Sequence, residues 1–182
     1  MKMSRLEEIY QDKIIPGMMS EFKYSNKMQV PKIEKIVVSM GVGMAAREKK
    51  LIEGAARDLA QITGQKPLIC KAKKSVSNFK LRQGMDIGLK VTLRGRRMYE
   101  FLDRMISLAI PRVRDFRGLS PSAFDGHGNY NLGFTEQMVF PEINPDQCEA
   151  TQGMNVALVT SAKTDDEGRR MLKLFGMPLR DS

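Results

Sequence analysis

One glycine-rich run has the spacing of a phosphate-binding turn. Gly41, Gly43 and Ala46 form a GxGxxA pattern, which in dinucleotide-binding enzymes lies between a strand and a helix, so that the helix N-terminus holds the pyrophosphate. Such a site also needs an acidic residue about 20 residues later, at the end of the next strand. The next predicted strand instead ends in lysines, including Lys71 and Lys73, which would suit only the 2′-phosphate of NADP. An NADP-binding enzyme is therefore an alternative to a purely structural role, in which the glycines form a bulge or tight turn.

Other catalytic or metal-binding groups are sparse. The single histidine, His127, lies in a glycine-rich stretch, and no Ser/His/Asp or Cys/His grouping follows from the sequence order. The carboxylates at 165–167 suit the first turn of a helix, where the macrodipole favours acids, so no metal is needed to explain them. Cys70 and Cys148 lack the spacing of a zinc site or a disulfide framework. We expect no catalytic residues, no metal and no cofactor.

Size and cysteine usage indicate the general class of protein. A chain of 182 residues is in the range of one domain, so we expect a single domain over 1–182. Two isolated cysteines fit a reducing, cytoplasmic setting. The N-terminus has acids and no apolar signal segment, and no later run approaches the roughly 18 apolar residues of a membrane span. We therefore expect no membrane association.

Positive charge is concentrated in one part of the chain. The sequence has 30 Lys and Arg against 21 Asp and Glu, a net charge of +9, which favours a polyanionic partner such as nucleic acid. Residues 66–97 contain ten basic residues and one acid, Asp86, and so account for the whole net charge. Residues 121–182 carry five basic and nine acidic side chains, so we expect them to face solvent or protein.

The basic segment also has side chains suited to RNA. Its lysines and arginines can neutralise phosphates, and Ser75, Ser77, Asn78 and Gln83 can donate hydrogen bonds. Phe79 lies among them, where an aromatic ring can stack on an unpaired base. Composition alone also allows two alternatives, namely that Phe79 covers the core while the lysines are solvated, or that the partner is DNA or an acidic protein.

A β-hairpin is predicted to position these residues. Residues 67–74 and 87–93 have strand character, and the second alternates apolar and polar side chains. Further strands are expected at 32–40 and 155–162, with Gly41 and Gly43 turning the chain after the first.

Four helices are predicted around these strands. The first begins with a Ser4/Glu7 capping box and is expected to end or kink at Pro16. The second covers 47–62 before a C-cap glycine, the third covers 96–110 before a proline, and the last follows a capping box at 164–167. Residues 111–146 are irregular. The pattern predicts an α+β fold, a two-layer sandwich of a mainly antiparallel sheet with helices packed on one face.

Several sequence blocks, in this order, resemble the bacterial form of the universal large-subunit ribosomal protein L-five family over nearly the whole chain. They are MQVPKIEKIVVSMGVG (28–43), TGQKP (63–67), KAKKSV (71–76), FKLRQGMDIGLKVTLRGRRMYEFLDR (79–104), PRVRDFRGLS (111–120), FDGHGNYNLGFTEQMVFPEI (124–143) and TDDEGRRMLKLFGMP (164–178).

The resemblance implies a structural, non-enzymatic protein of the large subunit that binds 5S rRNA in the central protuberance through its sheet face. By position, the implied 5S rRNA contacts are Ser39, Gln65, Phe79 and Thr92. Polar and basic residues around them complete the expected rRNA-binding set: Gln29, Lys32, Lys66, Lys71, Lys73 and Arg94.

Further partners are implied by the same resemblance. The connection at 75–84 is expected to reach the P-site tRNA, through Lys74, Ser75, Val76, Ser77, Asn78, Lys80, Arg82 and Gln83. Residues 112–142 are expected to touch a protein of the small-subunit head, and 23S rRNA and neighbouring large-subunit proteins are further expected partners. A nonspecific nucleic-acid chaperone is the second alternative function.

This sequence departs from the family pattern at three places. Ser39 stands where an asparagine is common, so a shorter donor or a water must make that contact. His127 replaces a typical arginine, and residues 144–152 lack basic side chains often found there. These departures concern individual contacts and leave the core blocks intact.

Overall fold

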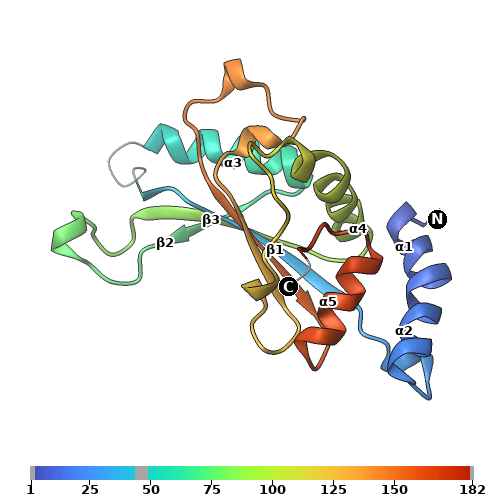
Figure 1. Cartoon of the computed structure of the whole chain (residues 1–182). Helices are drawn as coiled ribbons and strands as arrows, with labels where there is room; N and C mark the ends of the chain where they lie inside the picture. The colour runs from blue at the N-terminus through green and yellow to red at the C-terminus, as the bar shows by residue number, and fades with distance from the viewer. Residues whose placement is uncertain (1–2, 44–48, 181–182) are drawn as a thin grey trace. The chain divides into compact units, whose positions relative to one another are not determined.

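The computed structural model describes residues 3–43 and 49–180. It has a five-stranded antiparallel sheet in the order β2-β3-β1-β5-β4, with helices packed against it (Figure 1). The strands are β1 Ile33–Gly41, β2 Leu68–Lys71, β3 Asp86–Leu93, β4 Tyr130–Phe134 and β5 Met154–Thr160. The predicted α+β class is confirmed.

Residue contacts divide the chain into two compact units. One comprises residues 1–36, 94–132 and 157–182, and contains most of the helices; we name it the helical unit. The other comprises residues 37–93 and 133–156, and contains the β2–β3 hairpin; we name it the hairpin unit. The expectation of a single domain stays a prediction.

The helical unit begins with a helix that continues through a proline. It consists of α1 Arg5–Ile9, a π-helical turn Tyr10–Ile14 and α2 Ile15–Phe22. Of the two outcomes predicted at Pro16, a helix end or a kink, the helix end is therefore wrong. Pro16 lies in the first turn of α2, where a backbone N–H would have no acceptor within that helix, so its absence costs no hydrogen bond there. The π turn directly before α2 also shifts the hydrogen-bond register.

The same arrangement occurs before the second interior proline. Helix α4 Gly95–Arg104 continues as a π turn, Met105–Ala109, and then as a 3-10 turn, Ile110–Arg112. The helix predicted to stop before Pro111 thus continues through it to Arg112.

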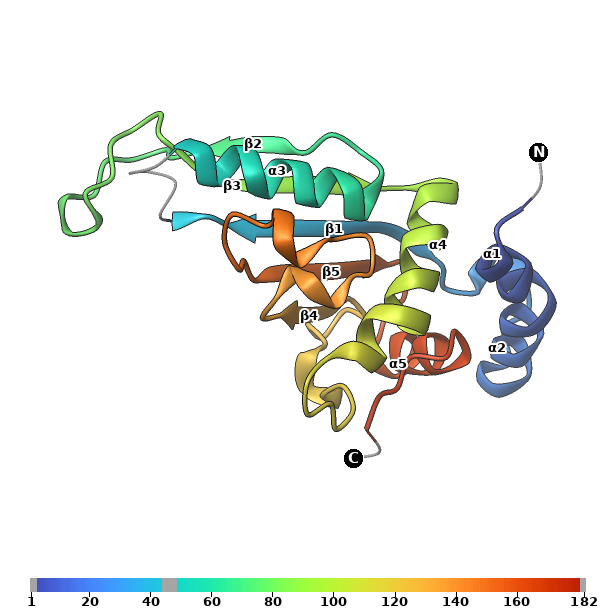
Figure 2. The same cartoon turned by 90° about the horizontal axis from the view of Figure 1, so that it is seen from above.

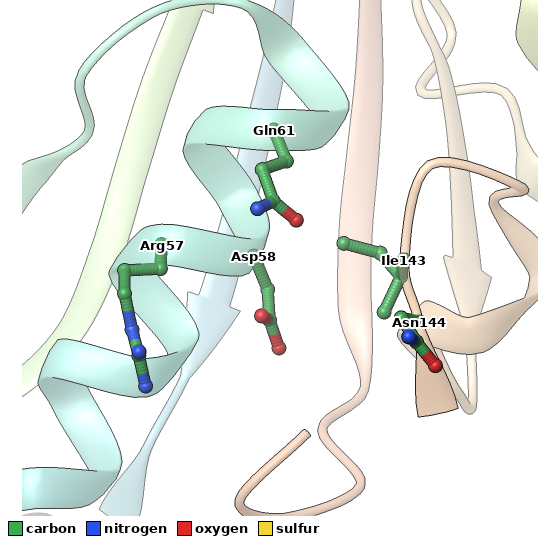
Figure 3. Close-up of a pocket in the computed structure, with 5 residues that line it drawn as sticks. All are labelled: Arg57, Asp58, Gln61, Ile143 and Asn144. Atoms are coloured by element: carbon green, nitrogen blue, oxygen red, sulfur yellow. The ribbon is translucent and has the colours of Figure 1, made fainter. Parts of the chain in front are cut away.

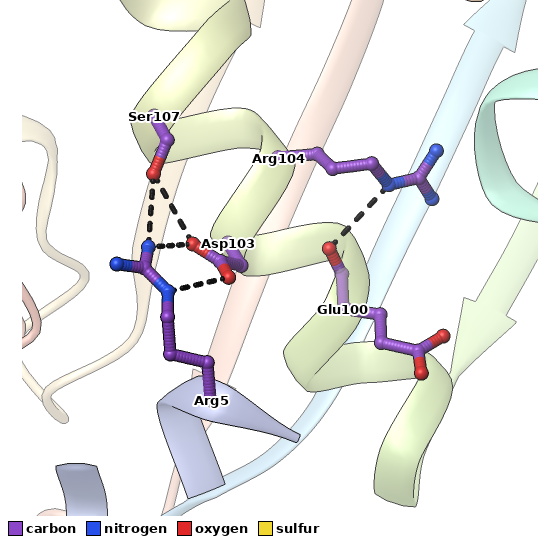
Figure 4. A network of polar contacts seen from close by, with 5 residues as sticks. All are labelled: Arg5, Glu100, Asp103, Arg104 and Ser107. Carbon is purple, nitrogen blue, oxygen red and sulfur yellow. Dashed lines mark hydrogen bonds and ion pairs between the residues drawn. The ribbon is translucent and has the colours of Figure 1, made fainter.

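Helix α1 is joined to α4 by a polar network. The Arg5 guanidinium forms an ion pair with Asp103 and donates from Nη2 to Ser107 Oγ at 3.2 Å (Figure 4). On the neighbouring turn, Arg104 Nε donates to the backbone carbonyl of Glu100 at 3.5 Å. The Arg5 hydrogen bond lowers the pKa of the Asp103 carboxyl.

The acidic residues near the C-terminus have a structural role. Helix α5, Asp165–Leu174, begins at Thr164, whose side chain accepts from the Glu167 N–H at 3.4 Å, as the capping pattern predicted. The Asp165 carboxylate accepts backbone N–H groups of Gly126 at 3.2 Å and Gly128 at 2.9 Å. These carboxylates therefore join a loop to a helix start.

The hairpin unit is built on α3, Lys49–Thr63, which packs against β3 (Figure 2). Its predicted C-cap, Gly64, has φ of +66°, a conformation that favours glycine. The predicted hairpin is confirmed, with β2 shorter than expected: Leu68 pairs with Lys90 and Cys70 with Gly88, antiparallel. Apolar residues of α3, β1 and β3 form the core of this unit: Ile52, Leu59, Ile62, Val38, Met40, Leu89, Val91 and Leu93.

Residues 111–146 contain β4 and little other regular structure. Short 3-10 turns occur there and elsewhere in the described chain at Lys27–Gln29, Ser77–Phe79, Pro121–Ala123, Gln137–Val139 and Pro145–Gln147. The described helices include none long and apolar enough to cross a membrane.

Candidate nucleic-acid interface

The sheet of the hairpin unit has one face that α3 does not cover. On β3, Leu89, Val91 and Leu93 are buried towards α3, so the alternating residues Lys90 and Thr92 lie on the opposite face. On β1 the buried residues are Val38 and Met40, which places Ser39 on that opposite face as well. We name this the open face. Ser39 and Thr92, two of the expected rRNA contacts, are thus half-buried polar residues on one surface.

Gln65 is fixed beside Thr92 by hydrogen bonds. Gln65 Nε2 donates to the backbone carbonyl of Thr92 at 3.3 Å. The buried Thr63 hydroxyl is within hydrogen-bond distance of two carbonyl oxygens, 2.7 Å from that of Leu59 and 3.1 Å from that of Gln65. The end of α3 therefore holds the Gln65 backbone, and a third expected rRNA contact lies next to Thr92.

Gly88 allows β1 and β3 to come close together. A Cβ at Gly88 would lie 2.7 Å from the Met40 carbonyl oxygen, closer than real Cβ atoms approach. Gly88 was not among the residues predicted from the sequence, although a glycine within a strand is a known signal of close backbone approach. It therefore belongs to the framework of the open face.

The connection between β2 and β3 extends beyond the ends of both strands (Figure 1). Its tip is a second small hairpin, in which the Val76 N–H donates to the Leu81 carbonyl at 2.9 Å and the Leu81 N–H donates back at 3.1 Å. The side chain of Ser75 accepts from the Gln83 N–H at 2.9 Å. Lys80 closes the turn with φ of +53°. The tip is therefore held by its own hydrogen bonds.

Phe79 is 77% exposed at this tip. It is not a core residue, so the alternative that it covers the core is wrong. An exposed aromatic ring between basic residues is available to stack on a base.

The basic side chains around the open face and the tip are unpaired. Seven of them are exposed and form no ion pair with any other described residue: Lys66, Lys71, Lys73, Lys74, Lys80, Arg82 and Lys90. Their charges are not neutralised by any other residue that the structure describes, and can attract phosphates.

Three expected rRNA contacts lie in the helical unit. Gln29 and Lys32 are exposed, and the Lys32 backbone N–H donates to the Ser161 hydroxyl at 3.0 Å. The Arg94 guanidinium donates to the Glu34 carbonyl at 3.5 Å. The structure therefore groups Ser39, Gln65 and Thr92 within the hairpin unit, whereas these three belong to the helical unit.

The GxGxxA run only partly falls in the described chain. Gly41 is the last residue of β1, and the Val42 N–H still donates to the Ile87 carbonyl at 3.0 Å. The strand thus ends at Gly41, as expected, while pairing with β3 extends to Val42, so the expected turn stays a prediction. Met44 to Ala46 lie outside the described residues, so the rest of this motif has no structural description.

Helix α3 and a loop border a small polar cavity of about 30 Å³ in the hairpin unit. Asp58 and Gln61 face Ile143 and Asn144 across it (Figure 3). This space suits ordered water and is far too small for a nucleotide.

Polar contacts around this cavity hold the loop. Arg57 forms a 2.7 Å ion pair with Glu149, and Gln137 Nε2 donates to Asp58 at 3.4 Å. Burial and the nearby Asp58 carboxylate raise the pKa of the Cys148 thiol, so this cysteine is not activated as a nucleophile. Within the described residues, no three His, Cys, Asp or Glu side chains gather as a metal site would require.

Two family models match the chain. The model for ribosomal protein L5 matches residues 26–82, and that for the C-terminus of the same ribosomal protein family matches residues 86–179. The chain is 59% identical over 175 residues to large ribosomal subunit protein uL5 of Thermosipho africanus, covering 96% of this chain and 97% of the relative. It is 58% identical over 178 residues to uL5 of Syntrophomonas wolfei, covering 98% and 100%, and 57% identical over 175 residues to uL5 of Thermotoga maritima, covering 96% and 95%.

Proposed function

Because this chain belongs to the ribosomal protein L5 family, the uL5 proteins of the large ribosomal subunit, we propose that it binds 5S rRNA with the open face of its hairpin unit. As a member of that family it is a structural component of the translation machinery rather than an enzyme. This assignment replaces the NADP-binding alternative. Other components of the large subunit, rRNA and ribosomal proteins, are its partners.

The observation that carries the proposal is the grouping of polar residues on the open face. Ser39 and Thr92 share that surface, and Gln65 is hydrogen-bonded beside Thr92. Hydroxyl and amide groups of this kind contact riboses and base edges, whereas the surrounding lysines contact phosphates. The arrangement suits folded RNA, because shape and a few polar contacts supply selectivity while charge supplies affinity.

The tip of the hairpin is proposed to contact a second RNA, the P-site tRNA. This role is supported by the reach of the connection beyond β2 and β3 and by the exposure of Lys74 and Lys80 together with Phe79. Residues 112–142 are proposed to face a protein of the small-subunit head, and 23S rRNA is a further proposed partner in the central protuberance.

Titration of the purified chain against 5S rRNA tests the main proposal. A control RNA of the same length and unrelated fold is titrated in parallel, each at two ionic strengths. We expect 5S rRNA to bind at least about tenfold more tightly than the control, and both affinities to fall as salt rises. Equal affinity for the two RNAs would contradict specific binding. Competition by duplex DNA as effective as that by 5S rRNA would instead favour the nonspecific chaperone.

A further inference from the structure

Three arginines of the helical unit have no partner within the described chain. Arg112, Arg114 and Arg117 lie within six residues of one another, and all are exposed. None forms an ion pair, and none uses its side chain in a hydrogen bond, with another described residue. By contrast, acidic side chains pair with five other described arginines outside the β2–β3 hairpin: Arg5, Arg57, Arg96, Arg169 and Arg170.

A fourth arginine, Arg180, is held beside Arg117. The Leu119 N–H donates to the Pro178 carbonyl at 2.9 Å, and the Arg180 N–H donates to the Leu119 carbonyl at 3.0 Å. Arg180 Nε then donates to the carbonyls of Arg117 at 2.7 Å and Gly118 at 3.1 Å. The two segments are therefore fixed side by side by backbone and side-chain hydrogen bonds.

Gly118 permits this close packing. Its φ is +94°, and a Cβ at this position would lie 2.8 Å from Arg180 Cγ. Any larger residue would be strained and would push the Arg180 side chain away. The position of Arg180 is thus set by the fold, and the remaining N–H groups of its exposed guanidinium stay available.

From this arrangement we infer that Arg112, Arg114, Arg117 and Arg180 form a further RNA-binding site for the phosphate backbone. We name these four residues the arginine cluster. Guanidinium groups bind phosphate oxygens with two parallel hydrogen bonds, which lysine cannot do. The only acid within 110–120 is Asp115, which is exposed. Among the residues that the structure describes, no acidic side chain forms an ion pair with the cluster.

RNA suits the arginine cluster better than a protein does. Stable protein interfaces are centred on apolar or aromatic side chains that fill pockets. The large exposed apolar residues of the described chain include none between 111 and 120 or between 178 and 180. A phosphate backbone needs no such anchor, because its binding depends on charge and hydrogen bonds.

This inference goes beyond the proposed function, which rests on the hairpin unit. The arginine cluster belongs to the helical unit, so it is built by a different part of the chain. It also refines the proposal for residues 112–142, because the first residues of that region would contact RNA and only later ones the small-subunit head.

Binding of a second RNA to a preformed complex tests the inference. The full chain is saturated with 5S rRNA and then titrated with a short labelled RNA duplex, at several salt concentrations. The test variant combines Arg112→Gln, Arg114→Gln and Arg117→Gln, while Lys13→Gln, Lys23→Gln and Lys163→Gln remove equal charge elsewhere in the same unit. We expect the arginine variant to bind the duplex about tenfold or more weakly, with a salt slope shallower by about 2 to 3, and the lysine control to bind as the unchanged chain does.

Each other outcome overturns the inference. Duplex affinity unchanged in the arginine variant would show that these residues do not bind phosphates. Equal losses of duplex affinity in the arginine variant and the lysine control would show only a general charge effect. Displacement of the duplex by polyglutamate as effectively as by unlabelled RNA would indicate an acidic protein partner. Loss of 5S rRNA binding in the arginine variant would assign the cluster to the first RNA. Thermal melts of all variants confirm that they are folded.

The two proposals can fail separately. If the unchanged chain does not bind 5S rRNA, the proposed function fails, and the duplex titration is performed on the free chain. A difference between the arginine variant and the lysine control would then still support the arginine cluster, and no difference would overturn it.

Discussion

Phe79 places a large apolar side chain in contact with water, although folding normally buries such residues. Its ring is 77% exposed, at the tip of a connection that is closed by the backbone hydrogen bonds between Val76 and Leu81. Exposure of an aromatic ring costs solvation free energy, which a bound partner can recover by covering the ring. The tip is thus organised before binding, which lowers the entropy cost of presenting the ring to RNA.

We predict that Phe79→Ala weakens RNA binding and leaves the fold intact. Loss of one stacked base costs about 1 to 3 kcal/mol, or roughly five- to a hundredfold in Kd. The measurement is a 5S rRNA titration beside a thermal melt. Leu108→Ala removes another exposed apolar side chain, 45% exposed in the helical unit, and should leave the Kd unchanged. A fall in Tm for Phe79→Ala with unchanged binding would contradict the stacking role.

The residues of the open face show what could be predicted from the sequence. Strand alternation places Thr92 opposite the buried residues of β3, and the family resemblance selected both Thr92 and Ser39. The hydrogen bond from Gln65 to the Thr92 carbonyl could not be predicted, because it depends on where the end of α3 meets β3. Spatial neighbours that are far apart in sequence follow from packing, which a single sequence does not reveal.

At the scale of elements, the two interior prolines show where local rules are insufficient. Pro16 and Pro111 each follow an isoleucine that directly follows a five-residue π turn, and in both cases the helical path continues past the proline. The local rule is that proline loses a hydrogen bond and clashes with the preceding turn. The π turns change the hydrogen-bond register locally, which allows the helical path to include the proline. The residue pattern that predicted a helix end does not reveal these π turns.

The contact between β1 and β3 leads to a prediction for Gly88. In Gly88→Ala the new methyl group would lie 2.7 Å from the Met40 carbonyl oxygen, so the strands must separate. We expect a loss of about 1 to 3 kcal/mol in the free energy of unfolding, measured by urea denaturation, together with weaker 5S rRNA binding. Gly41→Ala is the matched control, because a Cβ there meets nothing within 4 Å. Equal stability of the two variants would contradict the close approach.

The ion pair between α1 and α4 leads to a prediction for acid stability. The hydrogen bond from Arg5 lowers the pKa of Asp103 in the folded chain, so the pair stabilises the fold above the unfolded pKa of about 3.8 and loses this effect as the pH falls further. Asp103→Asn should therefore cost up to about 1 kcal/mol at neutral pH, since the pair is partly exposed, and nothing once the pH is well below 3.8. Urea denaturation across this pH range measures the difference. Asp12→Asn, which removes a carboxylate at an exposed position of the same unit, is the control variant.

At the scale of the whole molecule, charge is distributed unevenly along the chain. Residues 66–97 account for the entire net charge of +9, and nine of their ten basic side chains, all but Arg96, are exposed and form no ion pair with another described residue. Outside residues 66–97, salt bridges join elements within each unit. Examples are the ion pairs of Arg5 with Asp103 and of Arg57 with Glu149. The sequence alone identified the excess of charge, but only the structure separates paired arginines from unpaired ones.

This separation predicts how the affinity for 5S rRNA depends on salt. Each lysine that contacts a phosphate contributes about 0.7 to 0.9 to the slope of log K against log salt, because counterions leave the RNA on binding. Replacing Lys66, Lys71 and Lys73 by glutamine should make the slope shallower by about 2 to 3. The same change at Lys13, Lys23 and Lys163 lowers the net charge equally and should alter the slope far less, because none of those lysines is among the expected rRNA contacts. Equal changes in slope for the two variants would show that the RNA responds to total charge, and would remove the hairpin from its proposed role.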